Sequence, residues 1–413
     1  MKRYWKLILL AVVTFLGIGT FYFYANASAA EIYRFSLKDI EGDPKALEGV
    51  TIEGTLYPLS SYDPYGFKLV QGKEETEKNQ SYLQRMDGDF DMDPSVAALK
   101  KEYRSFLRGK NTDKNSYVED ENYVIYAADN YSYSSPNHQT IEISRLNKQT
   151  KKVEDFVYSF PKDTNDSYFY LNQIFYQENR LTLLIQKSDY TGNRYEDTFR
   201  IYVWDFDQEK MVTEGKTLDL LPEEDGKKQY PNLVSPSSSV SNNSKTAFLV
   251  QSGGTFDETG EMIGDIQTQV VLYDYNTLQA SEVIQKEENS LSITMNGVLT
   301  EDALYFYLPE EEGNILKADI TVENPALEKI FRAEEEMPVN SESDLKYSGA
   351  LMEVSGNLLY LLEDYKDEDN NRFINIYDLD AKKLLYKGKV EVNEGGKTAD
   401  EYELYMHNIY LNK

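Results

Sequence analysis

The stretch that decides the fold is Ser355–Gly388, SGNLLYLLEDYKDEDNNRFINIYDLDAKKLLYKG. It predicts a three-stranded meander, because short apolar runs alternate with polar segments rich in turn residues. Gly and Asn tolerate a positive φ, so the opening Ser-Gly-Asn predicts a tight turn. We expect strands at Leu358–Leu362 and Phe373–Tyr377, a third that starts at Leu384–Tyr386, a polar loop at Glu363–Arg372 and a turn at Asp378–Lys383.

Parts of this pattern recur through most of the chain, which indicates an internal repeat. A polar turn follows one strand later in each unit, at 145–147, 205–207, 274–276 and 378–380, with a poorer match at 319–320. A last strand after most turns gives about four strands per unit, as in propeller blades. The residues that precede the first apolar pair of each unit are spaced by 57, 65, 58 and 54 positions, and they are Asn122, Asn179, Ser244, Asp302 and Gly356.

The repeat predicts an all-β fold, a β-propeller of six blades, with seven as the alternative. The strands predicted at Val50–Tyr57 and Tyr65–Val70 have no complete unit of their own, and Tyr402–Leu411 resembles the first strand of the second unit. We therefore expect the N-terminal and C-terminal strands to pair and close the ring, since an unpaired edge strand promotes aggregation. A large irregular β-sandwich or two tandem β-domains are the alternatives, which the even spacing disfavours.

One helical pattern stands out, at Ser95–Lys110, where apolar residues recur at spacings of three and four. Asp93 and Pro94 before it are typical of a helix start, and Gly109 is typical of a helix end. We therefore expect one short helix near 95–108.

Composition narrows the class of protein. Hydrophobic residues make up 40% and charged residues 28% of the chain, which is enough for a buried core. The net charge of −28 would repel a phosphate backbone, so we expect no nucleic-acid partner. Cysteine is absent, which excludes disulfides and thiolate metal sites. With only two histidines, His138 and His407, a three-His zinc site and a His-based triad are poorly supported.

The first 30 residues have the pattern of an export segment. Lys2, Arg3 and Lys6 precede a charge-free run at Leu7–Ala25, and small residues follow as in a cleavage site. The run just reaches the length that spans a bilayer, so a retained transmembrane anchor and a cleaved signal peptide are both open, with a buried core helix as a third alternative. Anchor and signal both place residues 31–413, expected as a single domain, outside the cytoplasm, anchored to the cell membrane or secreted.

Over roughly residues 50–413, the repeat resembles the four-stranded blades of β-propeller proteins, in architecture and not in a specific sequence motif. With its N-terminal anchor and acidic propeller-like domain, the chain looks like exported proteins of Gram-positive bacteria whose function is uncharacterised. That resemblance implies the fold and the location, and it implies no catalytic residues.

Two acidic loops are the candidate metal sites. In the first, Asp87, Asp89, Asp91 and Asp93 alternate, and the second is Asp367–Asn371 followed by Asp378. Alternating carboxylates can bind calcium, but both loops lack the glycine of the EF-hand pattern. His138 lies in a loop by composition, and His407 is expected on one face of a strand. We therefore assign no metal, cofactor or catalytic residue.

The function expected first is a membrane-tethered extracytoplasmic binding, sensing or scaffold module without catalysis. Its expected partners are the cell membrane, through the N-terminal segment, and a protein or wall polymer on a propeller face. The chain lacks a nucleophile elbow, a phosphate-binding loop and a dinucleotide fingerprint. The alternative is a secreted carbohydrate-active hydrolase or lyase at the cell wall, whose chemistry can rest on paired carboxylates.

Overall fold

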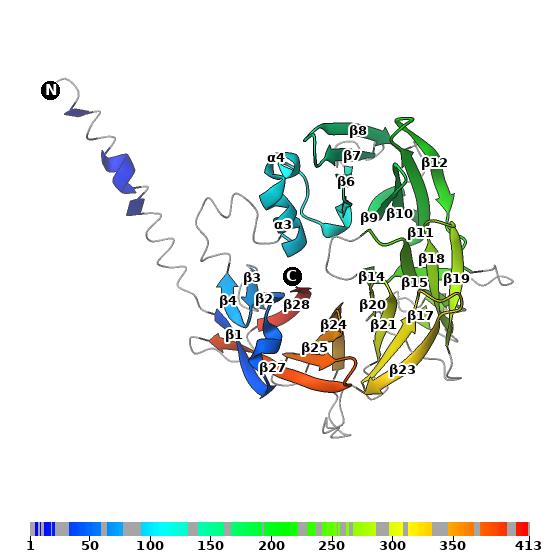
Figure 1. The fold of residues 1–413 in the computed structure, drawn as a ribbon. Helices are drawn as coiled ribbons and strands as arrows, with labels where there is room; N and C mark the ends of the chain where they lie inside the picture. The colour runs from blue at the N-terminus through cyan, green and yellow to red at the C-terminus, as the bar shows by residue number, and fades with distance from the viewer. Residues whose placement is uncertain are drawn as a thin grey trace.

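In the computed structural model the sheets follow one another around a ring, with two short helices between its first and second sheets (Figure 1). The residues that the structure describes are 5–6, 9, 12–17, 19–20, 33–58, 64–76, 92–130, 139–160, 167–191, 194–221, 229–236, 242–253, 255–256, 262–263, 267–285, 297–308, 313–332, 346–366, 372–394 and 402–411.

Six groups of strands form the ring, and we number them as blades. Blade 1 is β28 (Tyr402–Leu411), β2 (Val50–Pro58), β3 (Tyr65–Val70) and β4 (Lys73–Thr76). Blade 2 is β5 (Tyr117–Glu119), β6 (Tyr123–Asn130), β7 (Thr140–Asn147) and β8 (Val153–Ser159). Blade 3 is β9 (Ser167–Gln177), β10 (Arg180–Thr191), β11 (Arg194–Asp205) and β12 (Lys210–Thr217).

The other three blades complete the ring. Blade 4 is β13 (Gln229–Leu233), β15 (Lys245–Ser252), β18 (Gln267–Asp274) and β19 (Gln279–Gln285). Blade 5 is β20 (Gly297–Leu299), β21 (Ala303–Leu308), β22 (Asn314–Asp319) and β23 (Ala326–Arg332), with β14 (Ser235–Pro236) parallel to β20. Blade 6 is β24 (Lys346–Ser355), β25 (Leu358–Lys366), β26 (Arg372–Asp378) and β27 (Lys383–Glu394), with β1 (Tyr33–Gly42) added.

Smaller elements connect or decorate these blades. A short parallel pairing of β19 with β23 joins blades 4 and 5 into one nine-stranded sheet. The remaining elements are the hairpin β16 (Thr255–Phe256) and β17 (Met262–Ile263), the 3-10 turns η1 (Pro44–Leu47) and η3 (Lys114–Ser116), and the helices α3 (Pro94–Glu102) and α4 (Arg104–Leu107).

One hydrogen-bond pattern explains the repeat seen in the sequence. At the end of the third strand of a blade, an Asp or Asn side chain accepts hydrogen bonds from nearby backbone amides, as Asp274 does from Asn276 at 2.8 Å and Thr277 at 3.4 Å. A backbone N–H just after this residue then donates to the carbonyl that precedes the second strand. The donor and acceptor pairs are Lys148 and Asn122, Phe206 and Asn179, Tyr275 and Ser244, Ile320 and Asp302, and Leu379 and Asn357. Four of these acceptors are the same residues that mark the start of each repeat in the sequence. The fifth acceptor is Asn357, one residue after the repeat position Gly356.

Segments from the two ends of the described chain share blade 1. β28 pairs antiparallel with β2, from Leu411 opposite Val50 to Tyr402 opposite Pro58. β1 pairs with β27 and so extends blade 6 at its outer edge. The predicted pairing of N-terminal with C-terminal strands is therefore found, and the six blades agree with the predicted all-β fold class.

The closure of the ring differs from the prediction at one seam. Hydrophobic clusters join blade 1 to blade 6 and join blades 2 to 3, 3 to 4, 4 to 5 and 5 to 6. Helices α3 and α4 cover the remaining face of blade 2. In the described parts of the chain, no hydrophobic cluster joins blade 1 to blade 2 or to the helices. The pairing of β28 with β2 therefore completes the sheet of blade 1, but apolar packing between blades 1 and 2 is not found among these residues.

Two local predictions need correction. The sequence predicts a polar loop at Glu363–Arg372, but β25 continues to Lys366 and the side chains of Glu363 and Arg372 are both buried. Glu363 accepts hydrogen bonds from the Tyr307 hydroxyl of blade 5 and from Asn375 at 2.5 Å, and Arg372 donates to the Leu404 carbonyl of blade 1 at 2.8 Å. Partners on neighbouring blades therefore satisfy charges that the local sequence places in a loop.

The predicted helix is two helices. It is interrupted at buried Tyr103, whose φ of −122° and ψ of 43° are not helical, and Gly109 follows with a φ of +80°. At the N-terminus, the described residues form no helix that is long and apolar enough to cross a membrane, so the predicted transmembrane helix is not found.

Candidate functional site

A basic pocket beside α3 and α4 is the candidate site. Asp93 starts α3 by accepting a hydrogen bond from the Ser95 amide at 2.8 Å, and Pro94 occupies the first turn, where it needs no donor. Leu99 and Phe106 fix the helices on blade 2 by packing in their shared cluster. Val96 and Lys100 are four residues apart on α3 and so share one side of that helix, whereas Arg104 begins α4 and Arg108 follows its end in an extended conformation.

All four residues line a pocket of about 840 Å³. Its apolar part consists of buried Met92, Val96, Leu107 and Tyr117. Its polar part is Ser105, Asn111 and Thr112, and its cationic part is Lys100, Arg104, Arg108 and Lys110. The described lining of the pocket is therefore positively charged in a chain whose net charge is −28.

The chain that leaves α4 is held in place by hydrogen bonds. Gly109 has the positive φ that lets the chain turn, and no atom within 4 Å would meet a side chain there, so the conformation alone favours glycine. Asn111 then donates to Ser116 at 3.0 Å, and its carbonyl accepts from the Tyr117 hydroxyl at 2.6 Å. These contacts fix Lys110 beside the pocket.

Lys110 has the most distinctive environment of the four cations. Its Nζ lies 4.7 Å from the ring centroid of Phe106 and 4.9 Å from that of Tyr126, which is the geometry of a cation–π contact. Burial lowers the pKa of its amine below the usual 10.5, against the opposing effect of the Asp155 and Glu142 carboxylates. At a given pH, a larger fraction of this amine is therefore uncharged than on an exposed lysine.

No Asp or Glu is among the described residues that line the pocket. Glycoside hydrolysis commonly requires two carboxyl groups that flank the scissile bond. The described lining therefore has charges that can hold an anion and an amine able to accept a proton, and it includes no carboxylate pair.

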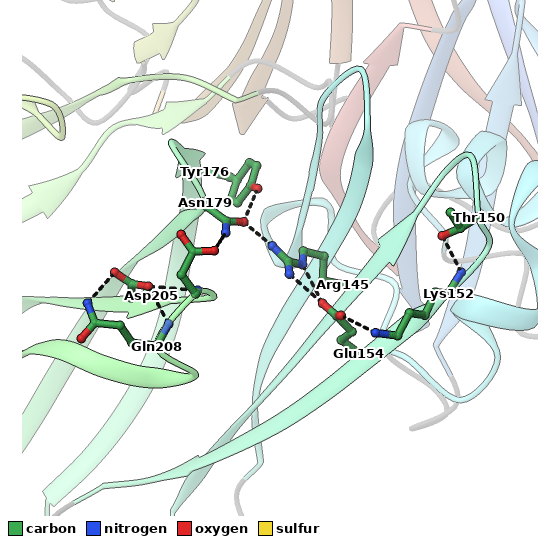
Figure 2. A network of polar contacts seen from close by, with 9 residues as sticks. Arg145, Thr150, Lys152, Glu154, Tyr176, Asn179, Asp205 and Gln208 are labelled. Carbon is green, nitrogen blue, oxygen red and sulfur yellow. Dashed lines mark hydrogen bonds and ion pairs between the residues drawn. The ribbon is translucent and has the colours of Figure 1, made fainter.

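A second polar network, between blades 2 and 3, has a structural role. Figure 2 shows Arg145 between Glu154, which it contacts at 2.6 Å, and Asn179, to which it donates. The guanidinium lies 4.0 Å from the ring centroid of Phe206 and 4.8 Å from that of Tyr123. Arg145 is 9% exposed, and its hydrogen bonds to Glu154 of blade 2 and Asn179 of blade 3 join the two blades.

The candidate residues from the sequence are not brought together. Asp87, Asp89, Asp91, His138 and Asp367–Asn371 lie outside the described residues. Asp93 caps α3, and Asp378 accepts from the Asp380 and Ala381 amides in its turn. His407 contacts the Thr55 hydroxyl at 2.9 Å on the surface of blade 1. Where the chain is described, no group of three or more His, Asp or Glu is placed to hold a metal ion.

The basic pocket was not predicted from the sequence. The signal was present, because Lys100, Arg104 and Arg108 recur every four residues along the predicted helix. That spacing predicts a basic helical side, but it does not distinguish a solvated surface from the wall of a pocket.

Comparisons with known proteins were made by sequence and by structure. No family model matches the chain, and no curated protein matches its sequence. Among solved structures, polysaccharide lyase Uly1 has a TM-score of 0.36 at 9% identity, over 67% of this chain and 57% of its own. An apocarotenoid oxygenase from Synechocystis has a TM-score of 0.43 at 10% identity, over 88% and 96%. The α-L-arabinofuranosidase Arb93A from Fusarium graminearum has a TM-score of 0.33 at 9% identity, over 65% and 71%.

The solved structures found in the comparison do not support the function expected first from the sequence, a module without catalysis. They include a polysaccharide lyase and a glycosidase, which belong to the class kept as the alternative, and not a module without catalysis. At these identities and TM-scores the likeness transfers no residue and no substrate to this chain.

Proposed function

We propose that the protein is a carbohydrate-active enzyme of the lyase class, which cleaves an acidic polysaccharide in the pocket beside α3 and α4. The observation that carries the proposal is the clustering of Lys100, Arg104, Arg108 and Lys110 around one pocket of an acidic protein. Net charge elsewhere would repel a polyanion, so a locally positive pocket would concentrate binding at this place.

Elimination fits the side chains of the pocket better than hydrolysis does. Hydrolysis commonly depends on a carboxylate pair, and the described lining has none. Elimination from a uronate requires a base for the proton beside the carboxylate and cations for the charge that develops on that carboxylate. Lys110, with its lowered pKa, is the base in this proposal, and Arg104 and Arg108 bind the carboxylate.

The proposed step is a β-elimination. The neutral Lys110 amine takes the proton from the carbon next to the uronate carboxylate, and the electron pair of that bond forms a carbon–carbon double bond. The bond between the adjacent carbon and the glycosidic oxygen breaks, and this oxygen takes a proton from water. Lys110 then returns its proton to solvent, so the products are an unsaturated uronate and a new chain end.

We propose separately that the protein is exported from the cytoplasm. The positive residues Lys2, Arg3 and Lys6 and the charge-free run Leu7–Ala25 favour export, as in exported Gram-positive proteins, with residues 31–413 as one extracytoplasmic domain. An acidic wall or extracellular polymer would be accessible to an enzyme in that place.

The first test measures unsaturated product. The full-length protein should raise the ultraviolet absorbance of polygalacturonate, alginate or hyaluronate solutions, and should not do so with neutral xylan. Lys110→Met keeps the aliphatic stem but removes the base, so we expect at least about a 100-fold lower rate. Because the base acts as the neutral amine, the wild-type rate should rise with pH toward the lowered pKa of Lys110.

Lys101→Met is the matched control, since Lys101 is exposed on α3 and does not line the pocket. It should leave the rate unchanged. New reducing ends without ultraviolet absorbance would show hydrolysis and would contradict elimination. No product from any acidic polymer, or full activity of Lys110→Met, would refute the proposed reaction.

A further inference from the structure

The Tyr57–Tyr405 end of one face of blade 1 is the feature that the proposed pocket does not use. Apart from this face and the helices beside it, neighbouring blades pack through hydrophobic clusters. Within the described chain, no such cluster covers the face of blade 1 that turns away from blade 6. In Figure 1 the helices follow blade 1 around the ring, so this face and the helices border the same seam.

This face is aromatic and rich in hydrogen-bonding groups. Tyr57 on β2 is 44% exposed, and its ring meets that of Tyr405 on β28 edge to face, with centroids 5.5 Å apart. Beside them, the Tyr405 hydroxyl donates to Glu403 at 2.6 Å, and His407 contacts Thr55 at 2.9 Å. An exposed ring surrounded by such groups can stack on the C–H face of a sugar while the groups bind its hydroxyls.

The charge of this face indicates which sugar it would take. Glu403 is exposed, and Glu53 on the same face is paired with Lys68, so Glu403 leaves the face with a negative charge. A uronate would be repelled there, whereas a neutral sugar would not. The pocket beside α3 and α4 has the opposite charge and would bind the uronate unit.

We infer that the Tyr57–Tyr405 face binds a neutral sugar unit of the same polymer whose acidic unit enters the pocket. The inference rests on the proposed function, and it narrows the substrate class to heteropolysaccharides that combine uronate with neutral sugars. A polymer of uronate alone would fill only the pocket.

The test is retention of the full-length protein in gels that contain neutral xylan or glucomannan. Tyr57→Ala should weaken retention about fivefold to tenfold, as expected for the loss of one stacked ring. Tyr170→Ala is the matched control, because Tyr170 is 48% exposed on β9 of blade 3, and it should leave retention unchanged. Both variants should bind polygalacturonate as the wild type does.

The outcomes separate the inference from the proposed function. No retention by neutral polymers, no effect of Tyr57→Ala, or an equal effect of Tyr170→Ala would refute the neutral-sugar site and leave the acidic pocket standing. Tyr57-dependent retention without any binding of polygalacturonate would support the neutral-sugar site and refute the proposed lyase.

Discussion

Removal of residues 402–413 is expected to unfold blade 1 and to lower the melting temperature of the whole domain. β28 pairs with β2 along its whole length and buries Tyr402, Leu404, Ile409 and Tyr410. At about 1.5–3 kcal/mol for each buried side chain, the loss is about 6–12 kcal/mol. A domain has about 5–15 kcal/mol of stability in total, so the truncated chain should be largely unfolded or aggregated.

Thermal unfolding of the full chain and of the chain ending at residue 401 measures this effect. Glu403→Ala is the matched control, since this exposed side chain lies on the same strand and leaves the pairing intact. It should shift the midpoint little. A truncated protein with the wild-type midpoint and solubility would contradict the role of β28 in holding blades 1 and 6 together.

Replacement of Arg145 by Met is the second change with a large expected effect. The side chain is 9% exposed, donates to Glu154 and Asn179, and lies against Phe206 and Tyr123. Loss of one partner of a buried charged network costs about 3–5 kcal/mol. We expect a lower midpoint in thermal or urea unfolding, with no change in the six-bladed fold.

Arg180→Met is the control for Arg145→Met. Arg180 also pairs with an aspartate, Asp205 at 3.3 Å, but its side chain is 57% exposed, so the change should stay within about 0.5 kcal/mol. The Arg145 hydrogen bond lowers the pKa of Glu154 below 4.5. The stability that this pair contributes is therefore present above that value and is lost as the pH falls through the lowered pKa. Equal effects of both variants would contradict the interblade role.

The sequence predicts the blades well because each blade depends on local signals. Asp274 and Asp378 form turns with their own neighbours, and the acceptors that close each hairpin recur at a regular spacing. The pairing of 402–411 with 50–58 also follows from the sequence, since both segments are strands that lack partners in their own units.

What the sequence does not predict depends on contacts between blades. Glu363 and Arg372 have the composition of a loop, yet partners from blades 5 and 1 allow both to be buried. The basic pocket has the same origin, because it forms only when the helices pack on blade 2 and leave Arg104 exposed. The seam beside blade 1 likewise depends on how the helices pack.

The most direct measurement of the central claim is a calorimetric titration of the full-length protein with an oligogalacturonate. We predict binding that weakens as salt is added, because the contacts are between exposed charges. Arg108→Gln should weaken it about tenfold, in the range of a charge-assisted hydrogen bond, and Lys101→Gln should not. Absence of binding, binding that does not respond to salt, or equal affinity of the Arg108→Gln variant and the wild type for the oligogalacturonate would contradict the assignment of the pocket as an acidic-sugar site.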